Sequence, residues 1–175
     1  MKVQADGFEF EFPGALEAFV FDEKDAAKTT YHGLSHAMKA VDLVVELPDV
    51  VLFIEVKDFY APDDYDFKSA LSVVEAQARR QALNHLREVL VHKYRDTWVY
   101  RWAERTAEAP QKPVRYLCVL SLSNGALGIV SKELRQALPV GLAGPRWKRE
   151  LGLGCAVLNP ERWASAFPGW ALQRL

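Results

Sequence analysis

Two apolar stretches, AVDLVVE at residues 40–46 and VVLFIEVK at residues 50–57, decide the fold of this chain. Both are rich in the β-branched residues that favour strands. The residues between them, Leu47, Pro48 and Asp49, suit a tight reversal. Two strands joined this closely should form an antiparallel hairpin. Because both are almost continuously apolar, both faces of their sheet should be covered, and we expect helices to pack on it.

Ionisable residues interrupt this apolar hairpin, and three of them, Asp42, Glu55 and Lys57, are expected at the same end of it. Side chains alternate between the two faces of a strand, so Glu55 and Lys57 should share one face with Phe53. Asp42 precedes Asp49 by seven residues and Glu55 follows it by six, so both carboxylates should lie at similar distances from the turn. Magnesium prefers oxygen ligands, typically one or two carboxylates with water and phosphate oxygens. The pattern therefore indicates a hard-cation site at one end of the hairpin.

The whole chain, residues 1–175, is predicted to form one α/β domain with a mixed sheet flanked by helices. Hydrophobic periodicity and the positions of Pro, Gly and Ser indicate the remaining elements. In chain order they are a strand over 8–12, a long helix over about 67–94, a strand over 114–120, a helix over 132–138 with Ser131 as its N-cap, a strand over 154–158 and a helix that begins at Pro160. Residues 15–22 fit either a short helix or a strand.

Composition narrows the class of protein. No run of about 18 apolar residues is present, so no membrane-spanning helix is expected. The N-terminus lacks the apolar segment of a secretory signal. Cys118 and Cys155 stand in apolar surroundings, which indicates buried thiols in a reducing cytoplasm. The net charge of −1 neither supports nor excludes nucleic-acid binding, although proteins that contact many phosphates usually carry a basic excess.

At residues 41–57 the sequence resembles the signature of the PD-(D/E)xK phosphodiesterase superfamily. The matching residues are Asp42 and, thirteen positions later, Glu55-Val56-Lys57. The superfamily includes restriction endonucleases, Holliday-junction resolvases and many defence and repair nucleases. The resemblance covers about residues 13–123 and implies a restriction-endonuclease-like core in the order helix, motif strands, helix, strand. Val41 stands where the family name has Pro, and Asp58 is an unusual residue after the lysine.

The resemblance also implies roles for these residues. Asp42, Glu55 and the backbone carbonyl of Val56 would hold Mg²⁺ or Mn²⁺. Lys57 would orient or help to deprotonate the attacking water and would stabilise the charge that develops on phosphorus. Many members add a glutamate from the first helix as a ligand or support. Glu17 matches it if residues 14–21 are helical, and Asp22 or Glu23 would replace it if that stretch is a strand.

Several other polar residues are candidate substrate contacts. Gln77 and Gln81 lie one helical turn apart and are similar to a glutamine that some branches carry on the helix after the lysine. His32 and His36 precede the first motif strand and could approach the metal site or a scissile phosphate. Residues 98–102 interleave aromatic side chains with Arg101 and are a candidate for contact with substrate or a protein partner.

The sequence therefore predicts a metal-dependent nuclease that acts on DNA in defence, mobile-element or repair pathways. A homodimer would suit one-site subunits that cut both strands. The alternative hypothesis is an inactive nuclease-fold protein that acts as a binding or scaffold subunit, and the near-neutral charge motivates it. An unrelated α/β domain would place Asp42 far from Glu55 and Lys57.

Overall fold

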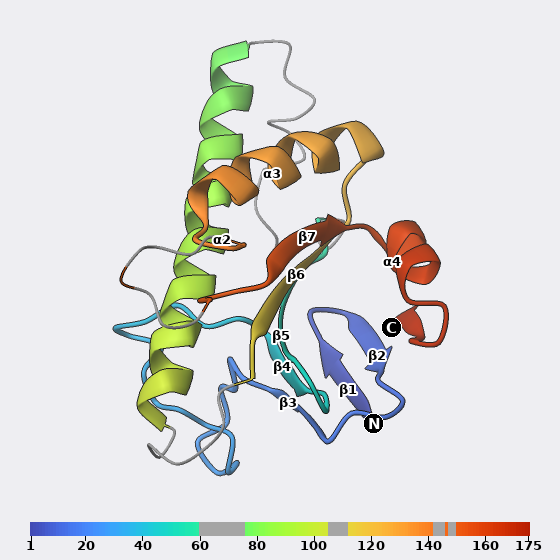
Figure 1. Ribbon diagram of the computed structural model, residues 1–175. Helices are drawn as coiled ribbons and strands as arrows, with labels where there is room; N and C mark the ends of the chain where they lie inside the picture. The colour runs from blue at the N-terminus through green and yellow to red at the C-terminus, as the bar shows by residue number, and fades with distance from the viewer. Residues whose placement is uncertain (60–75, 105–111, 142–145, 147–149) are drawn as a thin grey trace.

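A mixed sheet of five strands lies at the centre of the protein, as the computed structural model in Figure 1 shows. The structure describes residues 1–59, 76–104, 112–141, 146 and 150–175, and of residues 76–79 the backbone alone. In spatial order the strands are β3 (Glu17–Val20), β4 (Leu43–Glu46), β5 (Val51–Lys57), β6 (Val114–Leu120) and β7 (Gly154–Leu158). Strands β3, β4 and β5 pair antiparallel, whereas β5, β6 and β7 pair parallel. The predicted α/β class with a mixed sheet is confirmed.

The predicted hairpin is confirmed as β4 and β5. Leu43 pairs with Ile54 and Val44 with Phe53, so the register is centred between Pro48 and Asp49. Continued by one residue, this register places Asp42 opposite Glu55. Directly opposed residues of an antiparallel pair project from the same face. The two carboxylates therefore emerge together, on the face that also carries Phe53.

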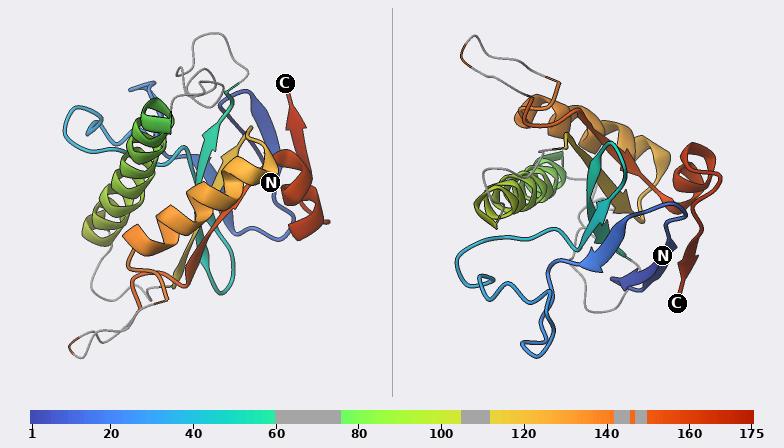
Figure 2. Two further views of the ribbon diagram at one scale, coloured as in Figure 1. Left: turned by 90° about the horizontal axis from the view of Figure 1, so that it is seen from above. Right: turned by 60° about the horizontal axis from the view of Figure 1, so that its bottom comes forward.

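Two helices cover that face, namely α2 (Ala76–Glu104) and α3 (Asn124–Ala137). Figures 1 and 2 show both helices on one side of the sheet. Tyr94 of α2 packs its ring 6.0 Å from that of Phe53, and the hydroxyl of Tyr116 donates to the carbonyl of Leu90. Although α2 is 29 residues long, neither it nor another helix among the described residues is apolar enough over its length to cross a membrane.

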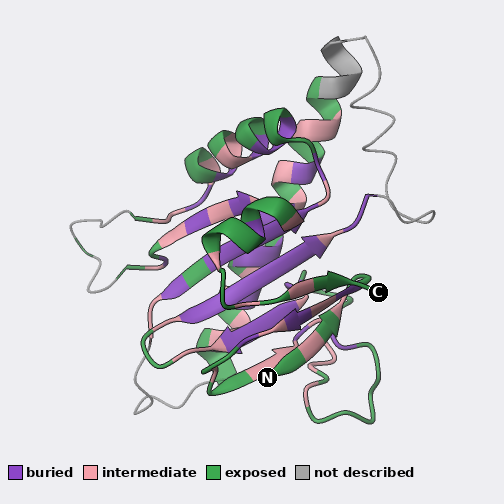
Figure 3. Ribbon diagram, turned by 90° about the vertical axis from the view of Figure 1, so that its right-hand side faces the viewer, coloured by how far each residue is buried: buried purple, intermediate pink, exposed green. Residues whose placement is uncertain are grey.

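A small antiparallel sheet and one short helix cover the opposite face. The sheet consists of β1 (Lys2–Ala5), β2 (Phe8–Glu11) and β8 (Leu172–Arg174), and the helix is α4 (Pro160–Ala166). Trp163 of α4 is fully buried and packs edge-to-face against Phe10 and Phe12, with ring centroids 5.4 and 6.3 Å apart. Figure 3 shows the buried central strands beneath the largely exposed α4 and β8. Both faces are covered as expected, but on this face most of the cover is a sheet and not helices.

Two helix boundaries differ from the predicted ones. Helix α2 continues ten residues beyond Tyr94 to Glu104, and residues 67–75, where it was expected to begin, lie outside the described residues. Helix α3 begins at Asn124, so Ser131 lies inside it and Ser123 occupies the N-cap position. The reason is a buried stripe at helical spacing that starts well before Ser131: Ala126, Leu127, Val130 and Leu134.

The helical alternative for residues 15–22 is wrong. Residues 17–20 form β3, and the pairing with the neighbouring strand continues at both ends, where Leu16 N donates to Glu46 O and Phe21 N donates to Asp42 O. Residues 1–59, all of which are described, contain no helix. The opening helix that the family resemblance implies is therefore not present before β4.

Candidate active site

Asp42, Glu55 and Lys57 meet at the end of the hairpin remote from its turn. The ammonium of Lys57 lies 3.4 Å from Oε1 of Glu55, and Oδ2 of Asp42 accepts a 2.7 Å hydrogen bond from the backbone N–H of Val56. Glu55 is fully buried, whereas Asp42 and Lys57 retain partial exposure. The expected convergence of the three side chains is confirmed as geometry. Their chemical roles stay a prediction.

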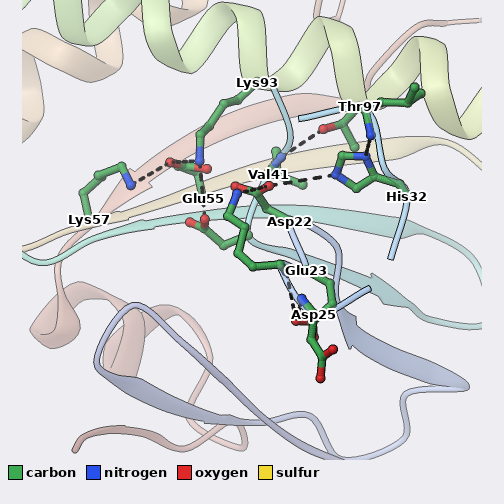
Figure 4. A network of polar contacts seen from close by, with 12 residues as sticks. Asp22, Glu23, Asp25, His32, Val41, Glu55, Lys57, Lys93 and Thr97 are labelled. Atoms are coloured by element: carbon green, nitrogen blue, oxygen red, sulfur yellow. Dashed lines mark hydrogen bonds and ion pairs between the residues drawn. The ribbon is translucent and has the colours of Figure 1, made fainter. Parts of the chain in front are cut away.

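A second lysine, Lys93 of α2, completes the cluster. Its Nζ lies 2.7 Å from Oε1 of Glu55 and 3.3 Å from Oδ1 of Asp42, and its side chain is only 10% exposed. Figure 4 shows it reaching down from the helix to Glu55, with Lys57 on the far side of the carboxylate. Sequence reasoning missed Lys93. The available signal was its position on the buried stripe of α2, where a charged side chain needs a partner.

Helix α2 also fixes the backbone that leads into Asp42. The hydroxyl of Thr97 accepts a 3.0 Å hydrogen bond from Val41 N, and Oδ2 of Asp96 accepts one of 2.9 Å from Lys39 N. Thr97 and Val41 are both fully buried. Because Thr97 lies one turn after Lys93, a single face of α2 holds both the backbone and the carboxylate at this position.

The hydrogen bond from Val41 to Thr97 gives a test of this arrangement. Thr97→Val keeps the shape of the side chain but leaves a buried N–H without its acceptor, so we expect a loss of about 1–3 kcal/mol in the free energy of unfolding, measured by urea denaturation. Thr97→Ser keeps the hydroxyl and should lose less. Equal losses in the two variants would contradict this role of the hydroxyl.

Burial and the charge of Asp42 both raise the pKa of Glu55. Its pKa rises from the ordinary 4.5 to about 8, first because the side chain is completely buried and second because the charge of Asp42 is near. The charges of Lys93 and Lys57 oppose this increase. Burial alone would lower the pKa of Lys93, but Glu55 and Asp42 together raise it well above its ordinary value. The pKa of Lys57 is raised by the same two carboxylates against the effect of burial. Both lysines are therefore cationic at neutral pH.

The raised pKa of Glu55 predicts how stability depends on pH. Between about 4.5 and about 8 the folded protein keeps a proton on Glu55 that the unfolded chain has released. With a chelator present to remove metal, the contribution of Glu55 to the free energy of unfolding should fall as the pH rises through this window and level off above it. Denaturation of the wild type and of Glu55→Gln at each pH measures that contribution as their difference. A difference that does not change with pH would contradict the raised pKa.

Two further residues, Asp22 and His32, lie beside the cluster. The hydrogen bond from Phe21 N to Asp42 O brings Asp22 next to Asp42, and the charge of Asp22 contributes to the raised pKa of Lys93. His32 stacks on the ring of Phe21, with a side chain only 3% exposed. Its Nδ1 accepts from Leu34 N at 3.0 Å, and its Nε2 faces Oδ1 of Asp22 at 3.9 Å (Figure 4).

Of the two acids suggested for a strand at residues 15–22, Asp22 is the one whose charge acts on Lys93, although its Oδ1 also pairs with Lys24 at 2.6 Å. Glu23 is engaged within its own loop, where it accepts hydrogen bonds from Lys24 N and Asp25 N and pairs with Lys28. Glu17, suggested for a helix, lies exposed in β3 opposite Glu46. Glu46 is four residues from Asp42 along β4, which is about 13 Å. Glu17 is therefore not a ligand of this site.

The other candidate contacts are not part of the cluster as the structure shows it. His36 and Gln81 are exposed, and Gln77 lies in α2 with its side chain outside the described part of the chain. Trp98, Arg101 and Trp102 line a pocket of about 250 Å³ near the start of β5. This pocket also includes Val51 and Phe53, so it lies toward the opposite end of β5 from Lys57.

No protein-family model, no curated protein and no solved structure matches this chain.

The cluster offers the oxygen ligands of a minimal magnesium site, namely two carboxylates and one backbone carbonyl. Oε2 of Glu55 is buried and has no hydrogen-bond partner among the described residues. The N–H of Val56 points to Asp42, and the carbonyl of a strand residue points to the same side as its N–H. No group of three His, Cys, Asp or Glu side chains suited to a metal occurs in the described ranges. Two carboxylates and a carbonyl would suit an ion that keeps several waters, as Mg²⁺ does.

Proposed function

We propose that the protein is a Mg²⁺- or Mn²⁺-dependent phosphodiesterase that cleaves DNA, built on a restriction-endonuclease-like core. The observation that carries this proposal is the placement of Asp42 directly opposite Glu55 with Lys57 on the same face, at one end of a buried hairpin. Side chains with opposed charges at a strand end are common as surface ion pairs. A fully buried carboxylate with an unpartnered oxygen, such as Glu55, is uncommon because its desolvation is unfavourable. Such groups are concentrated at functional sites, where a ligand can compensate this cost.

Asp42, Glu55 and the carbonyl of Val56 would hold the ion. The ion would act as a Lewis acid toward a phosphate oxygen and lower the pKa of bound water. Asp42 is already oriented by the backbone, since its Oδ2 accepts a hydrogen bond from Val56 N. This orientation of a ligand before binding reduces the reorganisation needed when the ion arrives.

Lys57 would stabilise the negative charge that develops on phosphorus in the transition state. Its raised pKa keeps the ammonium protonated at neutral pH. This favours electrostatic stabilisation over the alternative role, deprotonation of the attacking water, which needs a neutral amine. Asp22 adds negative charge beside Asp42 and Lys93, and so takes the place of the helix-borne glutamate that the family resemblance implies.

A second candidate function is a nuclease-fold protein that binds nucleic acid or another protein without catalysis. One observation favours it: the Lys93 ammonium already pairs with both carboxylates, and Lys57 pairs with Glu55 as well. In that case the buried charges would form a purely structural network. Metal binding by the wild-type protein separates the two candidates, because only the first requires it.

Cleavage assays with Lys57→Met test the proposed function. The wild type should cut at least one of single-stranded, duplex or branched DNA with Mg²⁺ or Mn²⁺, and should not cut with a chelator. Removal of the ammonium should lower the rate by about 10²–10³-fold, the usual effect of losing one transition-state contact. The matched control is Lys132→Met, which makes the same charge change at an exposed position of α3. A complete lack of metal-dependent cleavage by the wild type on these substrates and on RNA would overturn the proposal.

A further inference from the structure

Lys93 occupies the place between the two carboxylates. Its Nζ is 2.7 Å from Oε1 of Glu55 and 3.3 Å from Oδ1 of Asp42, so a single ammonium contacts both acids. The ammonium of Lys57 reaches Glu55 too, but at 3.4 Å and from a more exposed position. Among the described residues, Lys93 is therefore the group that joins the acids across the two strands.

Electrostatics explains why a cation is needed there. When Glu55 is ionised, as metal binding requires, its carboxylate and that of Asp42 repel each other strongly in a medium of low dielectric constant. An ammonium that contacts both reduces this repulsion. A divalent ion bound by the same oxygens would stand close to the ammonium, and the two positive charges would repel each other in turn. Simultaneous occupancy by the Lys93 ammonium and a divalent ion is therefore electrostatically unfavourable.

The side chain of Lys93 is able to leave without movement of α2. Lysine carries its charge on a flexible stem of four carbons, and the helix is held one turn further on by the hydrogen bond between Thr97 and Val41. Tyr94, next in the chain, is also fixed by packing against Phe53 and by its hydrogen bond to Leu151 O. Rotamer changes of Lys93 alone are therefore enough to vacate the position.

We propose that the Lys93 ammonium is a built-in cation that competes with the divalent metal ion for the Asp42–Glu55 pair. Metal binding then displaces Lys93, and the metal-free protein keeps its buried acids compensated. This inference rests on the proposed function for the identity of the competing ion. It adds to that function a residue that sets metal affinity and that lies outside the sequence motif.

Calorimetric titration with Mn²⁺ tests the competition. Lys93→Met removes the ammonium but keeps a flexible apolar stem, and we expect it to bind Mn²⁺ at least about tenfold more tightly than the wild type. Lys93→Arg keeps the positive charge and should bind no more tightly than the wild type. Equal or weaker binding by Lys93→Met, with measurable binding by the wild type, overturns the competition and leaves the proposed function standing. Binding by Lys93→Met alone supports the competition and favours the non-catalytic candidate for the native chain. If neither protein binds, both proposals are overturned.

A measurement on the wild type covers the case in which Lys93→Met does not fold. Acetic anhydride modifies exposed lysines, and mass spectrometry reports the modification of each one. With a chelator present, Lys93 should be protected by its burial and ion pairs. With saturating Mn²⁺ its modification should rise several-fold, while that of Lys112, which pairs with Glu46 at the other end of β4, stays constant. Unchanged modification of Lys93 at saturating Mn²⁺ would overturn the displacement.

Discussion

Glu55→Gln is expected to lower metal-dependent cleavage on the order of 10³-fold while the protein stays folded. The amide keeps the size of the side chain but cannot bring a negative charge to the ion. A metal ion contributes several kcal/mol of transition-state stabilisation, and losing it gives an effect of this size. The measurement is kcat/KM on the DNA substrate that the wild type cuts best.

The stability of the same variant should change in the opposite direction to its activity. Glu55 has a pKa of about 8 because it is buried beside Asp42, so ionisation of this side chain destabilises the folded protein at alkaline pH. Glutamine does not ionise, and the metal-free variant should be more stable than the wild type at about pH 8 and above. The control is Glu133→Gln, which removes a partly exposed carboxylate paired with Arg87 and should alter neither quantity strongly. Full activity in Glu55→Gln would show that this carboxylate is not a ligand of the catalytic metal ion.

Trp163→Ala is expected to destabilise the protein by about 3–5 kcal/mol, the usual effect of truncating a buried Trp. Trp163 is fully buried, and its indole N–H donates a 3.0 Å hydrogen bond to the carbonyl of Trp170. The side chain joins α4 to Phe10 and Phe12 on the outer face of the central sheet. Its loss therefore leaves a large cavity in that core.

Chemical denaturation with Trp102→Ala as the control measures this effect. Trp102 is 58% exposed, so its truncation should change the free energy of unfolding by less than about 1 kcal/mol. A loss of similar size in the two variants would contradict the packing of α4 and the small sheet against the central strands.

The hairpin was predictable because its determinants are local. Strand-forming residues flank a three-residue turn, and the position of that turn sets the register that brings Asp42 opposite Glu55. The strand period then places Lys57 on the same face. Nothing beyond about twenty residues of sequence is needed for this part of the site.

Lys93 was not predictable in the same way because its partners are distant in the chain. It contacts Asp42 across 51 positions, and only the packing of α2 on the sheet brings them together. The choice between Glu17 and Asp22 had a similar cause. Residues 15–22 contain apolar side chains at spacings that suit either structure, and pairing with β4 decides for the strand. That pairing moves Glu17 to the far end of β4 and leaves Asp22 beside the cluster.

Short edge elements were the other part that sequence did not reveal. Strands β1 and β8 are four and three residues long and contain no fully buried residue, so their sequences carry little hydrophobic pattern. They form because β2 lies between them and offers hydrogen bonds on both sides. Their structure is a consequence of tertiary contact rather than of local preference.

A crystal structure of the wild-type protein with Mn²⁺, with the ion located by its anomalous scattering, tests whether Asp42 and Glu55 bind the metal ion. We expect one Mn²⁺ bound by the carboxylates of Asp42 and Glu55, with the Lys93 ammonium moved away from both. A map at saturating Mn²⁺ with no anomalous peak between these carboxylates, and with Lys93 still in contact with them, would contradict this expectation.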